Sequence, residues 1–177
     1  MELDTLRYPL GRLVPARHSG PLDRERWMQD IAGIAGALRS TVASLTEEQL
    51  RMPYRPGGWT VRQVVHHLAD SDMNAYIRFK RALTEDAPLA GTFREDVFAE
   101  LADYADTPVE ASLALLEALH ARFLALLHGM ADEQFKRTFT SPAHGLMTID
   151  QAVERFAWHG RHHIAQIAQI ANRSHGS

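Results

Sequence analysis

The stretch Thr60-Val61-Arg62-Gln63-Val64-Val65-His66-His67-Leu68 combines a helix-start signal with the apolar spacing of an amphipathic helix. Thr60 and Gln63 have the spacing of a capping box, in which each side chain binds the backbone N–H of the other residue. The apolar face continues at helical intervals to about Leu83 through Val61, Val64, Val65, Leu68, Ala75 and Phe79. The stretch therefore predicts a long helix with one buried face, and it carries a histidine pair.

Three further long stretches show helical spacing. The first follows Asp23, which we interpret as an N-cap, and runs through Trp27 to Leu45. Thr107-Pro108 predicts the start of another helix, which extends to about His128 and ends at Gly129. Thr148-Ile149-Asp150-Gln151 is a capping box that opens the last helix. Four long helices without a convincing alternating strand predict an all-α four-helix bundle.

The remaining segments are predicted to be short or irregular. Residues 1–22 contain several prolines and glycines without periodicity, so we expect an extended N-terminal arm on the surface, remote from function. Short helices are expected after Thr46 and near Asp132, and one more within residues 84–106. Residues 140–145 are interpreted as a loop. The length of 177 residues predicts one domain over residues 1–177.

Composition narrows the possible functions. Hydrophobic residues make up 45% and charged residues 23% of the chain, as in soluble globular proteins. The net charge of -3 and the lack of a basic block argue against nucleic-acid binding. No apolar segment is long enough for a membrane helix, so we expect a cytoplasmic protein without a membrane partner. Because the chain has no cysteine, disulfides, thiolate metal sites and a thiol nucleophile are excluded.

The direction of each imidazole on its helix selects three of the ten histidines. At about 100° per residue, His163 lies roughly 40° and His159 roughly 80° from the core direction, on one flank, whereas His162 at roughly 140° should face water. On the earlier helix His67 lies roughly 100° off and His66 roughly 160° off. Two histidines one turn apart and a third from a neighbouring helix can bind one metal ion. We therefore predict that His67, His159 and His163 are metal ligands.

Alternative interpretations remain open for these side chains and their neighbours. A histidine at the edge of an apolar face is often only buried and hydrogen-bonded, and Gly160 can serve close helix packing as well as a ligand. Trp59 can line a pocket mouth. Carboxylates and an amide that could orient a ligand imidazole are Asp70, Asp72, Asn74, Asp150 and Glu154. Histidines placed on a polar face, in loops or in the tail, and considered weaker candidates, are His120, His128, His18, His144 and His175.

Two motifs carry a resemblance to a known family. The segment 53–71, with its Gly-Gly-Trp turn and His66-His67-Leu68, and the motif Trp158-His159-x-x-His162-His163-Ile164-Ala165 closely resemble the YfiT-like proteins of the DinB superfamily. The resemblance covers nearly the whole chain. It implies a four-helix bundle that binds one divalent metal through three histidines, one from the second long helix and two from the last. Position by position, these are His67, His159 and His163.

The resemblance also implies an enzymatic function. The family is described as metal-dependent hydrolases, so we expect a divalent ion, zinc first and nickel as an alternative, to activate water on an unidentified small-molecule substrate. Related members transfer a low-molecular-weight thiol such as bacillithiol to electrophiles, and this is the second hypothesis. A third is an ion that only ties two helices together. Family proteins are often dimers, so a homodimer is expected. No general acid or base is identified from the sequence.

Overall fold

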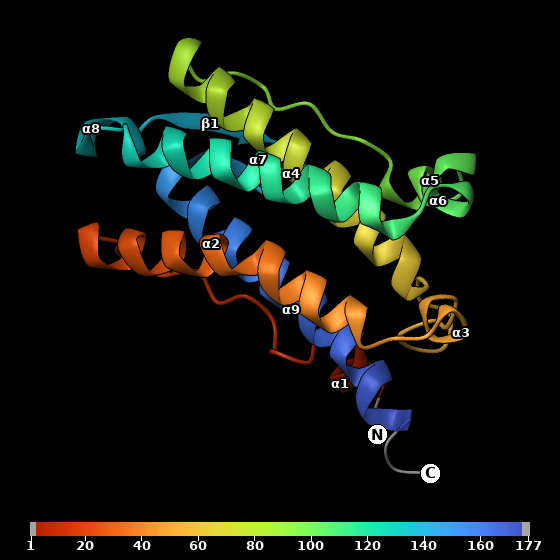
Figure 1. Ribbon diagram of the computed structural model, residues 1–177. Coiled ribbons are helices and arrows are strands. Elements are labelled where there is room, and N and C mark those ends of the chain that lie inside the picture. Colours follow the sequence, from red (N-terminus) through yellow and green to blue (C-terminus); the bar gives the residue numbers. More distant parts are fainter. Residues whose placement is uncertain (1–2, 175–177) are drawn as a thin grey trace.

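Four long helices form the body of the molecule, as the computed structural model shows for residues 3–174, with side chains described up to residue 171 (Figure 1). The long helices are α2 (Pro21–Ala43), α4 (Val61–Thr84), α7 (Val109–His128) and α9 (Ile149–Ser174). The short helices are α1 (Leu3–Arg7), α3 (Glu47–Leu50), α5 (Glu95–Phe98), α6 (Ala102–Asp106) and α8 (Asp132–Phe135). A two-stranded hairpin consists of β1 (Thr138–Ser141) and β2 (Gly145–Thr148). The predicted all-α four-helix bundle is confirmed.

The order of the helices around the bundle differs from their order in the chain. Helix α2 packs against α7 and α9, and α4 packs against the same two helices. Helices α2 and α4, which follow each other among the long helices, therefore lie on a diagonal. One apolar cluster centres on Phe79 and Phe123 and another on Leu68 and Leu116. Because α4 is a neighbour of α9, residues near the middle of these two helices can meet.

Capping boxes form at the starts of the two helices that carry the selected histidines. The Thr60 Oγ1 accepts from the Gln63 backbone N at 3.2 Å, and the Gln63 Oε1 accepts from the Thr60 backbone N at 2.9 Å. Thr148 and Gln151 make the same two bonds at the start of α9. The Thr46 box at α3 is also confirmed.

The N-caps expected at Asp23 and Thr107 are wrong, by three residues and by one residue. Helix α2 begins at Pro21 after the N-cap Gly20, and Asp23 lies in the first turn, where its carboxylate accepts from the Gly20 N–H at 3.2 Å. The N-cap of α7 is Pro108, which makes no side-chain capping bond. Pro21 occupies the first turn of α2, where the φ angle of proline is favourable.

The expected loop at residues 140–145 is instead part of the hairpin. Strands β1 and β2 pair antiparallel from Thr138 opposite Thr148 to Ser141 opposite Gly145, and the hairpin buries Phe139 and Met147. Each strand has four residues, too few for a clear alternating pattern. Residues 84–106 contain two short helices rather than one, and the arm begins with the helical turn α1 rather than being extended throughout.

Polar side-chain pairs connect the helices. Arg24 on α2 donates to Asp150 of α9 at 2.7 Å and to Asp132 of α8 at 2.6 Å. His120 on α7, expected near a polar face, is buried and lies 2.7 Å from the carboxylate of Asp72 on α4. The error arises because α7 packs along α4 on that side, which a helical wheel of α7 alone cannot show.

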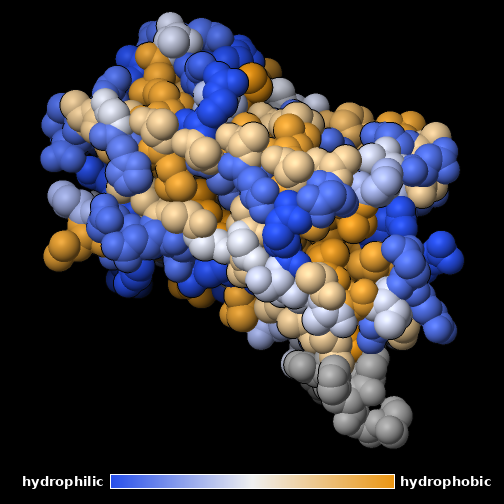
Figure 2. Space-filling view, viewed as in Figure 1, coloured by the Kyte–Doolittle hydropathy of each residue, from blue (hydrophilic) through white to orange (hydrophobic). Residues whose placement is uncertain are grey.

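The visible surface has the mixture of polar and apolar residues that the amino-acid composition leads one to expect. On the face that α7 crosses, hydrophilic and hydrophobic residues are intermingled (Figure 2). Among the described residues, every helix is too short or too polar to cross a lipid bilayer.

Candidate metal centre

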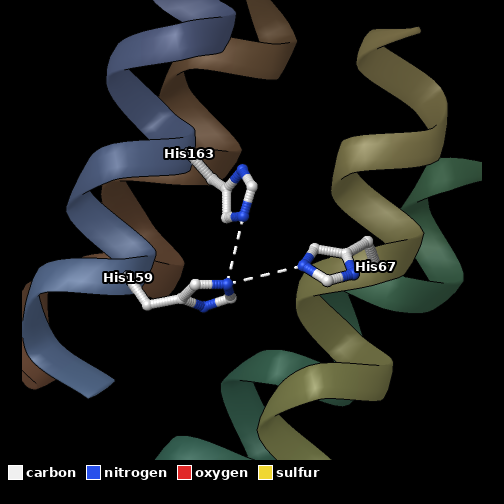
Figure 3. Close-up of side chains that lie close together, drawn as sticks. All are labelled: His67, His159 and His163. Carbon is white, nitrogen blue, oxygen red and sulfur yellow. Dashed lines mark hydrogen bonds between the residues drawn. The ribbon is translucent and has the colours of Figure 1, made fainter. Parts of the chain in front are cut away.

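Three imidazoles from two helices converge in the middle of the bundle. His67 projects from α4 toward His159 and His163 of α9 (Figure 3). The His159 Nε2 lies 3.4 Å from the His67 Nε2 and 3.1 Å from the His163 Nε2. One nitrogen from each ring lies within 4.8 Å of the other two. His67 and His163 are buried, and His159 is partly buried. The structure thus brings together the three histidines that the sequence analysis selected.

The amide of Gln166 fixes which nitrogen of His163 carries a proton. Its Nε2 donates to the backbone carbonyl of Arg7 at 2.7 Å and lies 3.0 Å from the His162 Nε2. Its Oε1 must then be the atom that lies 2.8 Å from the His163 Nδ1. Because a carbonyl oxygen only accepts, His163 Nδ1 is the donor, and its Nε2 keeps the lone pair that faces the cluster.

Burial keeps the three imidazoles neutral. Burial, together with the neighbouring His163, lowers the pKa of His67 to about 3. Burial and the nearby His67, His162 and Arg155 lower the pKa of His159 to about 3. The pKa of His163 is lowered well below its usual value, first by burial and then by His159 and His162. Neutral imidazole is the form that binds metal ions, so all three rings are in their ligand form at neutral pH.

The donor set suits a zinc-like ion. Two nitrogens bound tetrahedrally to one Zn²⁺ at about 2.0–2.1 Å lie about 3.3–3.4 Å apart. The observed Nε2 separations of 3.4 Å and 3.1 Å are close to this value. Without a shared proton or cation, lone pairs at such distances would repel one another. The residues present therefore fit a divalent ion with three imidazole ligands.

A small cavity adjoins the cluster and is lined partly by the N-terminal arm. Its volume is about 270 Å³, and Arg7, Tyr8 and Trp59 are among its lining residues. The Trp59 ring lies 4.6 Å from the His67 ring, centroid to centroid, so Trp59 does line a pocket, as considered from the sequence. The arm was expected to be remote from function, but it lines this cavity and the Arg7 carbonyl accepts from Gln166, so it lies beside the candidate site.

Among the described residues, Glu95 is the carboxylate that lies within 4.0 Å of a cluster histidine. Its Oε2 lies 4.0 Å from the His67 Nδ1, a buried nitrogen without a hydrogen-bond partner among the described residues. Partial desolvation, with a smaller effect of Asp96, raises the pKa of Glu95, although 61% of its side chain is exposed. Glu95 begins α5, within residues 84–106, where no site residue was identified from the sequence.

Two histidines next to the cluster are buried, contrary to expectation. His162, expected to face water, stacks on Trp158 with ring centroids 4.5 Å apart and also contacts Tyr8 of the arm. His66, which pointed away from the core on its wheel, lies with its Nδ1 2.7 Å from the hydroxyl of Ser112. The helical-wheel predictions took only the direction of the bundle core into account. In the structure the arm covers one flank of α9, and α7 covers the far side of α4.

The polar residues considered as partners of a ligand imidazole bind elsewhere. Asp70 accepts from Tyr104, and Asp72 pairs with His120. Asp150 pairs with Arg24, and Glu154 accepts from the Ala16 N–H. The Asn74 amide donates to the Asp70 backbone carbonyl. The partner that the structure places on His163 is Gln166. Its position three residues after His163, one helical turn, is the signal that could have identified it.

The weaker histidine candidates make no contact with the cluster among the described residues. His18 and His128 are exposed, and His144 in the hairpin turn lines a second, larger cavity. His175 lies outside the described residues.

Comparison with known proteins defines the class of this fold and site. A family model described as the DinB superfamily matches residues 31–167, and the chain belongs to this family. Among its relatives is "Putative metal-dependent hydrolase YfiT" of Bacillus subtilis, 43% identical over 169 residues, which are 95% of each chain. A similarly named protein of Geobacillus kaustophilus is 44% identical over 172 residues, 97% of each chain. The resemblance drawn from the two sequence motifs is thereby confirmed.

The same relative has a solved structure. YfiT from Bacillus subtilis, described as having an unusual four-helix bundle topology, matches this fold with a TM-score of 0.93 at 42% identity. The match covers 97% of this chain and 98% of that chain.

Proposed function

We propose that this protein is a metal-dependent hydrolase whose divalent ion binds His67, His159 and His163. The observation that carries the proposal is the convergence of three neutral imidazoles, each presenting one nitrogen, beside cavities that can admit a small molecule. The names of the relatives agree with this chemistry. Three protein ligands are typical of catalytic zinc sites, whereas structural sites use four.

The bound ion would supply Lewis acidity and lower the pKa of a water molecule toward neutrality. The protein's contribution is to hold the ligands. Gln166 orients His163 and fixes its tautomer, and Trp59 packs on the ring of His67. Such outer contacts restrict the rotation of the ligand rings and keep the donor nitrogens in place.

Glu95 is our candidate for the group that moves protons. It lines both cavities and lies beside His67, so a substrate held next to the cluster is within reach of its carboxylate. Its raised pKa brings its protonation equilibrium closer to neutral pH than that of an ordinary glutamate. In this role it accepts a proton from water and returns it to the leaving group.

Several finer features belong to the same proposal. We expect zinc, with nickel as an alternative, because imidazole ligands suit both ions and cellular supply decides between them. We expect one ion per chain, a homodimer and a cytoplasmic location. A low-molecular-weight thiol would compete with water for the same coordination position, so thiol transfer is an outcome that the test must separate.

The test uses metal-free protein resupplied with zinc or nickel. Metal content is measured by elemental analysis, and turnover of small esters and amides is measured with and without an added thiol and electrophile. We expect one ion per chain and metal-dependent hydrolysis that Glu95→Gln reduces by roughly 10²- to 10⁴-fold, the usual contribution of a general acid or base.

Each other result has a definite meaning. Failure to bind an ion, or binding that survives loss of all three histidines, would overturn the metal site. Turnover only when a thiol is present would replace hydrolysis by thiol transfer. A bound ion without turnover of any substrate would favour a structural role.

A further inference from the structure

The larger of the two cavities described above, which His144 lines, borders the histidine cluster. Its volume is about 460 Å³, within the range of small-molecule sites. It lies among α4, α9, the hairpin and residues 92–96, and His159 and Glu95 line both this cavity and the smaller one. A molecule in the larger cavity can therefore extend to the three imidazoles.

One part of the cavity wall is apolar. Phe79, Phe139, Phe156 and Met147 line it and are buried in the bundle. This wall can receive the uncharged part of a ligand, such as a hydrocarbon chain or an aromatic ring.

Two arginines on the cavity wall lack a carboxylate partner. Among the described residues, no carboxylate oxygen lies within 4.0 Å of a guanidinium nitrogen of Arg78 or Arg155, whereas Arg94 in the same wall is paired with Asp96 by two hydrogen bonds. The Arg78 Nε donates to the carbonyl of Gly91 at 3.0 Å. The Arg155 Nε is buried without a hydrogen-bond partner in the described part of the chain.

Both arginines line the cavity, from different helices, and both act on the same histidine. Arg78 is on α4 and Arg155 is on α9, yet both charges lower the pKa of the His144 imidazole in the hairpin turn, in addition to its burial. The acid next to Arg155 is Glu154, and its carboxylate accepts from the Ala16 N–H at 3.0 Å.

Burial lowers the pKa of Arg155, and Glu154 opposes this effect electrostatically. Glu95 and Asp96 line the same cavity, but among the described residues none of these three carboxylates pairs with Arg78 or Arg155. Guanidinium groups stay protonated even when partly buried, so the cavity retains two positive charges without a direct ion pair.

We propose that this cavity binds the oxyanion of the substrate, a carboxylate or a phosphate, between Arg78 and Arg155. The uncharged part of the substrate lies on the phenylalanine wall, and its reacting group reaches the three histidines. The inference rests on the proposed hydrolase function and specifies its substrate class as small organic anions. The planar fork of arginine matches both carboxylate and phosphate oxygens, and an anion could accept from the Arg155 Nε, which is otherwise buried without a partner in the described part of the chain.

The test measures the binding of simple probes to metal-free protein by calorimetry at low ionic strength. The probes are 3-phenylpropionate, phenyl phosphate and the uncharged 3-phenylpropionamide. We expect either anion to bind at least about tenfold more tightly than the amide, because only an anion can neutralise the guanidinium groups. Arg155→Gln and Arg78→Gln should each weaken anion binding by roughly 10- to 100-fold and leave amide binding unchanged.

Arg122→Gln is the matched control. It removes the same charge from an exposed position on α7 that does not line the cavity. Equal binding of amide and anions to the unmodified protein would overturn the proposal, and so would an Arg122→Gln effect as large as that of Arg155→Gln. Should Arg155→Gln fail to fold, Arg155→Lys, which keeps the charge but not the fork, and Arg78→Gln provide the same comparison.

Failure of this inference is distinguishable from failure of the proposed function. Anion binding that depends on Arg78 and Arg155, in a protein that holds no metal at the histidines, would overturn only the hydrolase proposal. Metal-dependent hydrolysis of neutral esters, with no preference for anionic ones, would overturn only the oxyanion site.

Discussion

Replacing Gly160 by alanine tests how closely α9 approaches α2 beside the histidine cluster. A Cβ atom at Gly160 would lie 2.5 Å from the Ile34 Cδ1 and 3.0 Å from its Cγ1 and Cγ2. Ile34 is almost fully buried in the core, so it has little room to move. The glycine therefore serves close helix packing, the first of the two interpretations that the sequence left open.

Two opposing contributions set the size of the effect. Alanine is favoured over glycine inside a helix by about 0.8–1.0 kcal/mol. Overpacking a filled core costs about 1–3 kcal/mol. Contacts shorter than van der Waals distance with three atoms of one buried side chain place this site in the upper part of that range. We expect Gly160→Ala to lower the free energy of unfolding by about 1–2 kcal/mol.

Urea unfolding provides the measurement, and Gly33→Ala is the matched control. Gly33 is exposed within α2, and its added Cβ would contact nothing within 4 Å, so this variant should gain up to about 1 kcal/mol. Ile34→Val removes the Cδ1 atom, and combining it with Gly160→Ala should recover about 0.5 kcal/mol or more relative to the sum of the single effects. If Gly160→Ala stabilises the protein as Gly33→Ala does, the argument from close approach is refuted.

Three further predictions concern the histidine cluster. His163→Ala should leave the bundle folded and lower zinc affinity, measured by competition with a chelator. The loss should exceed the roughly 10- to 100-fold expected when a residue that hydrogen-bonds a ligand imidazole is removed. A variant that still binds one ion tightly would contradict the assignment. Gln166→Leu should lower zinc affinity by roughly 10- to 100-fold, whereas Gln169→Leu, which loses only a bond to the arm, should not change it. In metal-free protein the pKa values of His67 and His159 are lowered to about 3 by burial, so below pH 6.5 the unfolded chain binds protons that the folded chain does not. The free energy of unfolding should then fall as the pH falls from about 6.5 toward 3, by up to about 1.4 kcal/mol per pH unit for each of the two histidines, and urea unfolding of His67→Gln should show a shallower slope.

Sequence motifs predicted the start of a helix correctly where the interacting residues lie within one turn of each other. The capping boxes at Thr60 and Thr148 give the starts of α4 and α9 because both partners of each box lie within one turn. The hairpin was missed because strand pairing depends on residues opposite one another, from Thr138 to Thr148, and not on a pattern within either four-residue strand.

The candidate site was predictable in part. Two of its histidines share one face of α9, and the third was selected on α4 by direction and by family resemblance. Gln166 and Glu95 were not identified. The orientation of the Gln166 amide depends on the carbonyl of Arg7, and the position of Glu95 depends on how residues 84–106 fold back on α4.

The sequence by itself determined the four amphipathic helices, the starts of α4 and α9 and the histidines able to face a common partner, because these properties depend on residues within a few turns of one helix. Only the tertiary structure decided which helices are neighbours, and hence that His67 meets His159 and that Arg78 and Arg155 line one cavity. Contacts between residues about 80 to 90 positions apart come from the packing of side chains across helices, which no local pattern encodes.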